Sequence, residues 1–366
     1  MPQTRNAPDL VIIVVIFLLL TLGVVMVYSA SAAYSLHKFG DSFFYAKRQM
    51  LFAALGVFLM LVVSRLDPQL FQRWAKPGLL ICFILLVAVL IPGVGMTRNG
   101  AQSWLGIGAF SIQPSEFSKM GIILFLSWYL TQNAHRVSSF SKGLLTPLAI
   151  AGTVFALIMM QPDLGTGTVM MGTAVVMIYA AGARLKHLLG LSLVGVLGFV
   201  GLVLAAPYRI QRITAFLNPW QDPLGAGYQL IQSLYAIGPG GLMGLGLGMS
   251  RQKHLYLPEP HTDFIFSILA EELGFIGAGT AIILFGILAW RGLRVAITAP
   301  DLFSSLVAAG VTGMIVIQAV INIGVVTGAF PVTGITLPFL SYGGSSLTLT
   351  LVAVGLLLNL SRFSRQ

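Results

Sequence analysis

The segment DLVIIVVIFLLLTLGVVMVYSAS, residues 9–31, decides what kind of protein this is. After Asp9 it contains no charged side chain. A helix of about 20 apolar residues spans the hydrocarbon core of a bilayer. The run is too long for the core of a cleaved signal peptide, and no small-residue cleavage site clearly ends it. The segment therefore predicts a transmembrane helix.

The rest of the chain has the same character. Of its 366 residues, 57% are hydrophobic and 9% are charged, whereas a soluble domain carries about 25% charged residues. This composition excludes a soluble enzyme and predicts an integral membrane protein. The single cysteine, Cys82, lies in an apolar run, which excludes an internal disulfide and any metal site built on several thiolates.

Ten apolar runs have roughly the length of a membrane-spanning helix. They cover residues 9–31, 49–65, 77–92, 115–132, 143–160, 164–181, 187–206, 263–290, 302–328 and 345–360. The sixth begins with Gly165-Thr166-Gly167, a weak start for a helix. The predicted fold class is an all-α integral membrane protein with about ten transmembrane helices in one polytopic domain, residues 1–366.

Ten spans place both termini on one side of the membrane, and the positively charged loops indicate which side is cytoplasmic. With a cytoplasmic N-terminus, the inner segments contain 12 of the 21 Lys and Arg residues but only 3 of the 11 acids. Most of the formal charge of +10 then lies on the inner side, and the outer side is nearly neutral. We therefore expect a multi-pass protein with both termini cytoplasmic.

One loop, residues 207–262 between the seventh and eighth runs, is much longer than the others and lies on the outer side. Its aromatic and aliphatic residues argue against disorder. The stretch Gly227–Ile237 has apolar residues at helical spacing, which predicts a short amphipathic helix. The alternating glycines Gly244, Gly246 and Gly248 predict a tight turn and closely packed backbone.

Acidic residues open three of the helices that begin on the outer face: Glu116, Asp163 and Asp263. The tenth run opens with a stretch that contains Ser341 and Ser345. Helix capping explains such residues, above all Ser345 and Asp163. Lys119 follows Glu116 by one turn, so the two can pair. Such a pair faces either a polar cavity or a neighbouring helix, and the sequence leaves both readings open.

Asp263 follows a loop that carries Arg251, Lys253, His254 and His261. A carboxylate in a mostly apolar, basic-rimmed site could act as a general base toward a hydroxyl, with capping as the alternative. Glu271 lies two helical turns further on, about 12 Å by helical rise, and is expected to extend a polar track from Asp263. Glu272 points elsewhere, so at least one of Glu271 and Glu272 is expected to meet a neighbouring helix.

Of the nine basic residues predicted on the outer side, four arginines stand out: Arg48, Arg98, Arg209 and Arg212. Arginine at an interface commonly faces lipid headgroups. The alternative is a phosphate cradle, because planar guanidinium groups match oxyanions.

Motifs over nearly the whole chain resemble the SEDS family (shape, elongation, division, sporulation), which includes RodA, FtsW and SpoVE. They are VYSAS (27–31), KRQ (47–49), RNGAQSW (98–104), QPSE (113–116), QPDLGT (161–166), NPW (218–220), LPE (257–259), TDFIF (262–266), EELG (271–274) and LPFLSYGGSS (337–346).

The resemblance implies a peptidoglycan glycosyltransferase of the bacterial cytoplasmic membrane, which polymerises lipid II at the outer leaflet. The family's essential acid matches Asp263, its Glu and Lys of the fourth helix match Glu116 and Lys119, and its basic residue opening the second helix matches Arg48. The Asp of its QPDLG motif matches Asp163. A class B penicillin-binding protein, a transpeptidase, is the implied partner.

Asp263 is then expected to be the catalytic base of an inverting transfer. The expected substrate-binding residues are Arg48, Arg98, Glu116, Lys119, Asp163, Arg209, Arg212, Lys253, Ser341 and Ser345. No cofactor is firmly implied, and the acids do not form a metal motif, although Mg²⁺ or Mn²⁺ could help neutralise the leaving pyrophosphate. Two alternatives stay open: a lipid II flippase or transporter, and a non-catalytic scaffold for a transpeptidase.

Overall fold

The structure, a computed structural model, describes residues 7–98, 101–107, 110–204 and 207–364. The longer helices are α1 (Leu10–Phe39), α2 (Phe44–Val63), α3 (Pro68–Leu90), α4 (Pro114–Gln132), α5 (Leu145–Met159), α6 (Leu164–Ala180), α7 (Leu185–Leu204), α8 (Pro207–Leu217), α9 (Tyr228–Ile237), α10 (Ile265–Thr298), α11 (Leu302–Val326) and α12 (Gly344–Ser361). Short helical turns are η1 (Ala134–Arg136), η2 (Phe140–Leu144), η3 (Pro219–Gln221) and η4 (Gly238–Gly240). The strands are β1 (Met96–Arg98), β2 (Ala101–Ile107) and β3 (Phe110–Ile112).

Each of the ten predicted apolar runs coincides with a helix. Among the described residues, 7 helices are long and apolar enough to cross a membrane: α1, α2, α3, the continuous η2–α5 segment, α10, α11 and α12. Helices α6 and α7 are apolar but shorter. The chain is therefore a multi-pass membrane protein, and the predicted number of ten spans is approximate.

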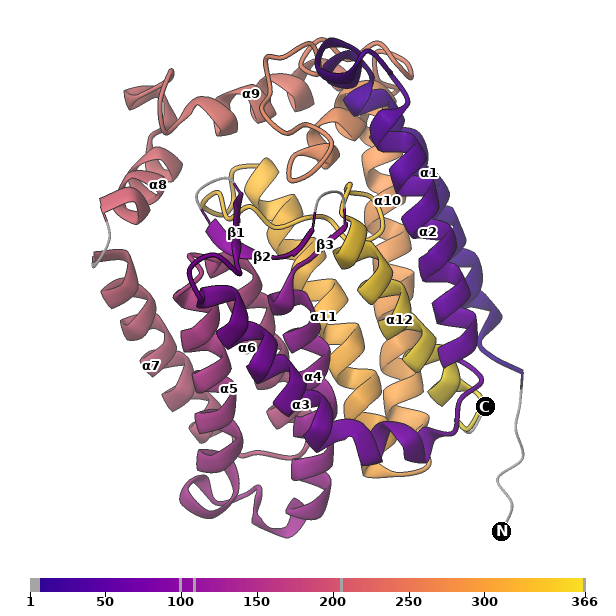
Figure 1. Cartoon of the computed structure of the whole chain (residues 1–366), viewed down its shortest axis with the longest axis vertical. Coiled ribbons are helices and arrows are strands. Elements are labelled where there is room, and N and C mark those ends of the chain that lie inside the picture. Colours follow the sequence, from indigo (N-terminus) through magenta and orange to yellow (C-terminus); the bar gives the residue numbers. More distant parts are fainter. Residues whose placement is uncertain (1–6, 99–100, 108–109, 205–206, 365–366) are drawn as a thin grey trace.

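Helices α11 and α12 form the centre of the bundle. Helix α11 packs against α4, α6, α10 and α12, and α12 packs along the length of α2. Most of their side chains are buried, whereas α2 and α3 expose large aliphatic residues on their outward sides. Figure 1 shows α1, α2, α10 and α12 on one side of α11, with α3 to α7 on the other.

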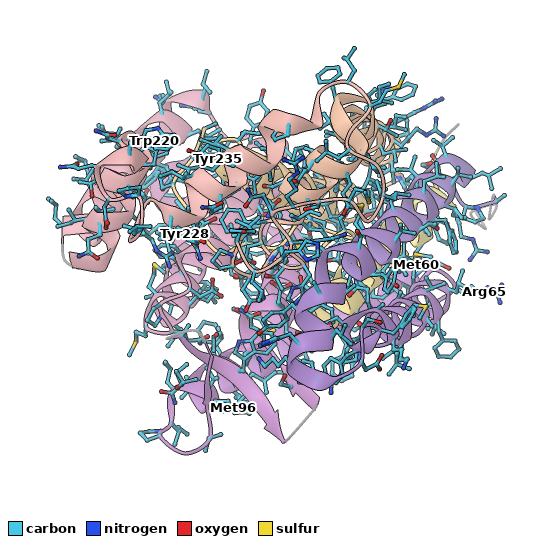
Figure 2. All side chains as sticks on the ribbon, turned by 90° about the horizontal axis from the view of Figure 1, so that it is seen from above. Met60, Arg65, Met96, Trp220, Tyr228 and Tyr235 are labelled. Atoms are coloured by element: carbon cyan, nitrogen blue, oxygen red, sulfur yellow. The ribbon has the colours of Figure 1, made fainter. Side chains whose placement is uncertain are left out.

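Both ends of the described chain lie at one end of the bundle. The Asp9 carboxylate forms an ion pair with Arg291 of α10 at 2.6 Å, and the backbone amide of Asp9 donates to Ser361 at the end of α12. The segment between α7 and α10 lies across the opposite end, with α8 and α9 forming an arm over it (Figure 1). Seen from that end, Trp220, Tyr228 and Tyr235 lie on this arm, away from Met60 and Arg65 (Figure 2).

The long loop contains more structure than the sequence predicted. Helix α9 confirms the amphipathic helix expected at 227–237, while α8 was not predicted. Between α3 and α4 the chain forms an antiparallel sheet in the order β1-β2-β3, which the sequence analysis missed because no alternating pattern of useful length marks it. These elements cover the end of the bundle remote from Asp9.

Helix α10 is broken at Gly274, whose φ of 64° and ψ of −162° lie outside the helical region. Loop backbone completes the hydrogen bonding there: the Leu245 amide donates to Glu271 at 2.9 Å, and the Phe275 amide donates to Gly241 at 2.9 Å. Gly244, at φ 78°, has no room for a Cβ beside the Glu272 carbonyl. This confirms the close backbone packing predicted for the alternating glycines.

Candidate functional site

The backbone around Asp263 is fixed by three hydrogen bonds from other segments. The His261 carbonyl accepts from the Tyr342 amide at 2.8 Å, and the Thr262 carbonyl accepts from the Ser341 hydroxyl at 2.7 Å. The Asp263 carbonyl accepts from the Asn322 amide group at 2.8 Å. Three successive carbonyls are thus held by α11 and the segment before α12, which fixes the backbone from which the Asp263 side chain projects.

The Asp263 carboxyl lies just before α10, outside the membrane-spanning helices, and is half-buried. Burial raises its pKa to about 7; the charges of Glu259 and Asp163 add to the rise, and Arg212 opposes it. A Cβ at Gly334 would lie 3.6 Å from Asp263 Oδ2, and Gly334 has a φ of 74° that disfavours a side chain. Asp263 is therefore a partly exposed carboxyl that borders Gly334 and has a pKa suited to proton transfer near neutral pH.

Glu116 and Lys119 form the pair that their spacing predicted. Lys119 Nζ lies 3.0 Å from Glu116 Oε1, and both side chains are buried. Lys119 also donates to the Gln318 side chain of α11 at 2.8 Å. The second carboxylate oxygen of Glu116 has no hydrogen-bond partner among the described residues. The pair thus faces a neighbouring helix, one of the two arrangements left open by the sequence, while the free oxygen keeps a functional role available.

One face of α11 connects this pair to Asp263. Gln318 and Asn322 are one helical turn apart. Gln318 donates to the Thr336 carbonyl at 3.0 Å, and Asn322 donates to the Ile335 carbonyl at 2.6 Å as well as to Asp263. The sequence analysis did not assign these two amides a role; a polar pair four residues apart in the apolar run 302–328 was the available signal.

Asp163 joins the starts of α4 and α6. One carboxylate oxygen caps α6 by accepting from the Thr166 amide at 3.0 Å, which confirms the capping interpretation. The other oxygen accepts from Gln113 at 3.0 Å and from Ser115 at 3.1 Å. The charge of Asp163 also acts on Asp263, so the two acids belong to the same polar region.

Two of the four predicted outer arginines are described with their side chains. Arg212 of α8 donates to the Val332 carbonyl at 3.2 Å, and its charge lowers the pKa of Asp263. Arg48 of α2 is half-buried, with its guanidinium 4.3 Å from the centre of the Phe44 ring. The side chains of Arg98 and Arg209 lie outside the described residues.

An aromatic cluster borders the Asp263 segment and was not predicted. The His261 ring lies 4.3 Å from the Tyr45 ring and 5.8 Å from the Tyr342 ring, between centroids. His261 is buried, and burial lowers its pKa to about 4, so the imidazole is neutral at pH 7. Its ring contacts fix the segment from the side of α2, and its buried Nδ1 has no hydrogen-bond partner among the described residues.

Lys253 does not join the group around Asp263. Its ammonium lies 3.0 Å from Glu272 and also donates to Ser29 of α1, in a buried cluster. Because this pair holds the loop against α1 and α10, the contacts of Lys253 do not support its expected place among the substrate-binding residues. Glu272 contacts a neighbouring helix, as expected.

The polar track expected from Asp263 to Glu271 is wrong. The Glu271 carboxylate accepts from the Ser250 hydroxyl and from the Arg251 amide at 2.8 Å, so the loop occupies both of its oxygens. The cause is the break at Gly274, which admits loop backbone beside this part of α10.

The two serines before α12 differ. Ser341 accepts from the Leu337 amide and donates to Thr262, so it positions the Asp263 segment rather than capping a helix. Gly343 occupies the N-cap of α12 without a side-chain cap, and the buried Ser345 hydroxyl has no partner among the described residues. The capping role expected for Ser345 is therefore wrong.

The described part of the chain contains no group of three His, Cys, Asp or Glu side chains that could hold a metal ion. The acids near Asp263 are instead committed to Lys119, to the amide that starts α6, or to neighbouring polar side chains. The described residues around Asp263 include one carboxyl of raised pKa and, in Arg212, a basic side chain whose charge acts on it.

Comparisons with known proteins cover the entire chain. A family model described as "Cell cycle protein" (FtsW, RodA, SpoVE) matches residues 9–366. Stage V sporulation protein E of Bacillus subtilis is 61% identical over 365 residues, 100% of both chains. A protein named "Probable peptidoglycan glycosyltransferase FtsW", from Trichlorobacter lovleyi, is 46% identical over 96% of this chain and 93% of its own length.

Solved structures agree with this result. A chain from a structure described as "Structural coordination of polymerization and crosslinking by a peptidoglycan synthase complex" has a TM-score of 0.80 and 33% identity, covering 97% of this chain and 98% of its own. The rod shape determining protein RodA of Thermus thermophilus has a TM-score of 0.71 and 29% identity, over 98% of each chain. The chain therefore belongs to the FtsW/RodA/SpoVE family of cell cycle proteins.

Proposed function

We propose that this chain is a peptidoglycan glycosyltransferase that polymerises lipid II, with Asp263 as the general base. The observation that carries the proposal is the carboxyl of Asp263, whose pKa is raised. It projects from a segment in which three successive backbone carbonyls accept hydrogen bonds, at the end of the bundle remote from Asp9. The name of the relative at 46% identity supports the reaction class.

In this reaction Asp263 takes the proton of the acceptor sugar's 4-hydroxyl as that oxygen attacks the anomeric carbon of the donor strand. The bond from this carbon to the pyrophosphate oxygen breaks, so the configuration inverts and undecaprenyl pyrophosphate leaves. A base contributes about 10²–10⁴-fold when its pKa is near the working pH.

Basic side chains then neutralise the leaving pyrophosphate, whose charge grows in the transition state. Arg212 and Arg48 are the described candidates, because one acts electrostatically on Asp263 and the other lies beside the aromatic cluster that contacts His261. Arg98 and Arg209 belong to the same proposal. Lys119 remains tied to Glu116 and Gln318 and is assigned to shaping the site. The effect of a chelator on polymerisation tests whether Mg²⁺ or Mn²⁺ helps to neutralise the leaving pyrophosphate.

The site lies on the outer side if both termini are cytoplasmic, which the loop charges favour. A class B penicillin-binding protein is the proposed partner. The similar peptidoglycan synthase complex, in which polymerisation and crosslinking are coordinated, supports this choice because crosslinking is the reaction of a transpeptidase.

A purified-protein assay separates the three candidate functions. The full chain, with and without its transpeptidase partner, is incubated with fluorescent lipid II, and glycan ladders are resolved by electrophoresis. Ladders support the transferase. Transport of lipid II across liposome membranes without ladders would support the flippase, and neither activity alongside partner binding would support the scaffold. The flippase alternative rested on Glu271 as an acid deep in the membrane. The Glu271 carboxylate is instead hydrogen-bonded to Ser250 and Arg251 of the loop, which removes this support.

A further inference from the structure

A separate polar depression lies at the end of the bundle where the described chain begins and ends. It measures about 410 Å³, and its lining residues are Gln69, Gln72, Arg73, Lys76 and Trp128. Hydrogen bonds from Asn359 to the Val63 and Leu66 carbonyls place the start of α3 beside the end of α12. The depression is therefore remote from Asp263, which α11 holds near its opposite end.

The sequence of α3 builds one wall of this depression. Asp67 caps the helix by accepting from the Gln69 amide at 2.9 Å. Positions 69, 72, 73 and 76 follow the i, i+3, i+4, i+7 spacing of a single helix face. Pro77 stands inside the helix, and Figure 1 shows the first turns of α3 crossing the end of the bundle before the helix turns into it.

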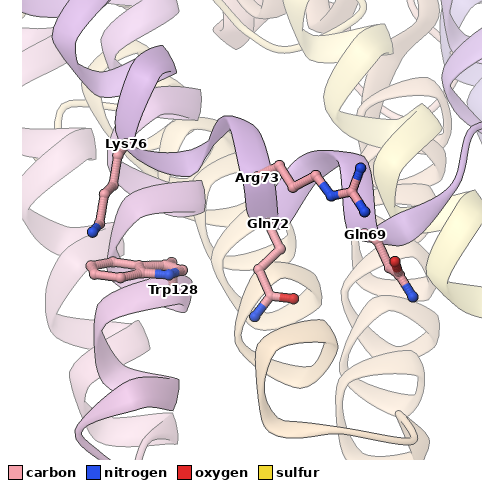
Figure 3. Close-up of a pocket in the computed structure, with 5 residues that line it drawn as sticks. All are labelled: Gln69, Gln72, Arg73, Lys76 and Trp128. Carbon is pink, nitrogen blue, oxygen red and sulfur yellow. The ribbon is translucent and has the colours of Figure 1, made fainter.

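The other wall is the indole of Trp128 on α4. Lys76 Nζ lies 4.1 Å from the centre of that ring, so a cation–π contact places the ammonium at the rim (Figure 3). Arg73 projects from the preceding turn of α3, and its guanidinium extends away from Lys76 and the indole, on the far side of Gln72 (Figure 3). Among the described residues, no acid forms an ion pair with Arg73 or Lys76.

Lys76, Gln72, Arg73 and Gln69 form a row of hydrogen-bond donors along the depression, which suits an anionic headgroup that carries a phosphate. Guanidinium and ammonium groups bind phosphate oxygens, and amides donate to the same oxygens or to hydroxyls attached to them. The apolar surroundings favour a lipid as its carrier: Leu70 and Trp74, on the outward side of the same turns, are 37% and 52% exposed. Tryptophans at this level are typical of the membrane interface.

We propose that this depression binds the phosphate of an anionic phospholipid headgroup, with Arg73 and Lys76 as the anion-binding residues. The acyl chains would lie along the apolar side of α3. Basic residues at this end also serve membrane topology, but a topological role needs only charge, whereas the amide-lined wall and the Lys76–Trp128 contact form a defined site.

The test measures binding of phosphatidylglycerol to the purified full chain in detergent by native mass spectrometry, with phosphatidylcholine of the same acyl chains as reference. Wild-type protein is expected to prefer phosphatidylglycerol at least about tenfold, since each basic residue near a membrane surface contributes to anionic-lipid binding. Arg73→Gln/Lys76→Gln should remove the preference, and Arg73→Lys/Lys76→Arg should retain most of it.

The matched control is Arg65→Gln/Arg294→Gln, which removes two exposed charges at the same end but outside the depression. It should keep the preference. The proposal is overturned if Arg73→Gln/Lys76→Gln binds phosphatidylglycerol like wild type, or if the control loses as much binding, which would indicate diffuse surface charge. Displacement of the lipid by equal concentrations of inorganic phosphate or pyrophosphate would overturn the lipid assignment in favour of a free-phosphate site.

Discussion

Asn322 Nδ2 lies 2.8 Å from the Asp263 carbonyl oxygen and 2.6 Å from the Ile335 carbonyl oxygen. A single amide near the end of an apolar helix therefore ties together the two segments that border the carboxyl of Asp263. Because Asn322 touches only backbone, it acts on the proposed reaction through the position of Asp263.

Asn322→Ala is expected to lower kcat for glycan polymerisation by about tenfold to a hundredfold with little change in KM, because small displacements of a catalytic group have effects of this size. Asn359→Ala is the matched control: Asn359 also donates to two carbonyls, those of Val63 and Leu66, but at the opposite end of the bundle. Thermal unfolding should show comparable destabilisation for the two variants. Equal kcat values at matched folded fractions would contradict the positioning role.

The rate of polymerisation should depend on pH through Asp263. Its pKa of about 7 means that the carboxylate, the form that accepts a proton, increases between about pH 6 and pH 8. We expect kcat/KM to rise over this window and then level off. Arg212→Gln removes the charge that lowers this pKa, so the rise should move to higher pH. A profile of Arg212→Gln shifted to lower pH would contradict the electrostatic assignment.

Folding stability should change with pH in the opposite direction. The pKa of Asp263 is raised from 3.8 in the folded protein, so between about pH 4 and pH 7 the folded state binds more protons than the unfolded state. Stability therefore falls as pH rises through this window, and the loss is complete above the folded pKa. Asp263→Asn should raise the unfolding temperature relative to wild type at pH 8 and much less at pH 4.5. A lower unfolding temperature of Asp263→Asn than of wild type at pH 8 would show that the carboxyl is stabilised in its charged form.

Removing one charge of the Glu116–Lys119 pair should lower the free energy of unfolding more than removing both charges does. Lys119→Met leaves a buried carboxylate unpaired, which typically costs about 3–5 kcal/mol. The double variant Glu116→Gln/Lys119→Met removes both charges and should recover part of the lost stability. Thermal unfolding of the two single variants and the double variant measures this coupling. Strictly additive effects would mean that the two charges do not interact.

Lys253 and Glu272 should matter for stability rather than for substrate binding. The double variant Lys253→Met/Glu272→Gln removes a buried ion pair that holds the loop to α1 and α10. We expect its folded fraction to polymerise lipid II with unchanged KM. A strong rise in KM would instead support a substrate-binding role for Lys253.

The sequence predicted the parts of this fold that depend on local composition. Apolar length located the ten bundle helices, spacing located α9, and the three-residue step from Glu116 to Lys119 predicted their pair. It missed the β1-β2-β3 sheet, two of whose strands have only three residues, and it missed α8, although the amphipathic pattern of residues 207–217 was an available signal. It also misjudged Glu271, because the carbonyls and carboxylates near the break at Gly274 are satisfied by a loop that lies earlier in the chain. Such pairings depend on tertiary contacts.

In the candidate site, too, local sequence predicts some features and tertiary contacts determine the others. Asp263 stood out as an acid at the start of a helix, but its importance rests on Asn322, Ser341 and Tyr342, which come from 59 to 79 residues further along the chain. Nothing in the local pattern around Asn322 or Ser341 indicates which carbonyl each would bind.

The most direct test of the central claim is single-turnover polymerisation of fluorescent lipid II by wild-type protein and by Asp263→Asn, each with the transpeptidase partner. The substitution preserves size and removes the base. We predict a rate reduced by about 10²-fold or more with lipid II binding retained, as expected for a lost general base. Glycan ladders formed at the wild-type rate by Asp263→Asn would contradict the assignment of Asp263 as the base.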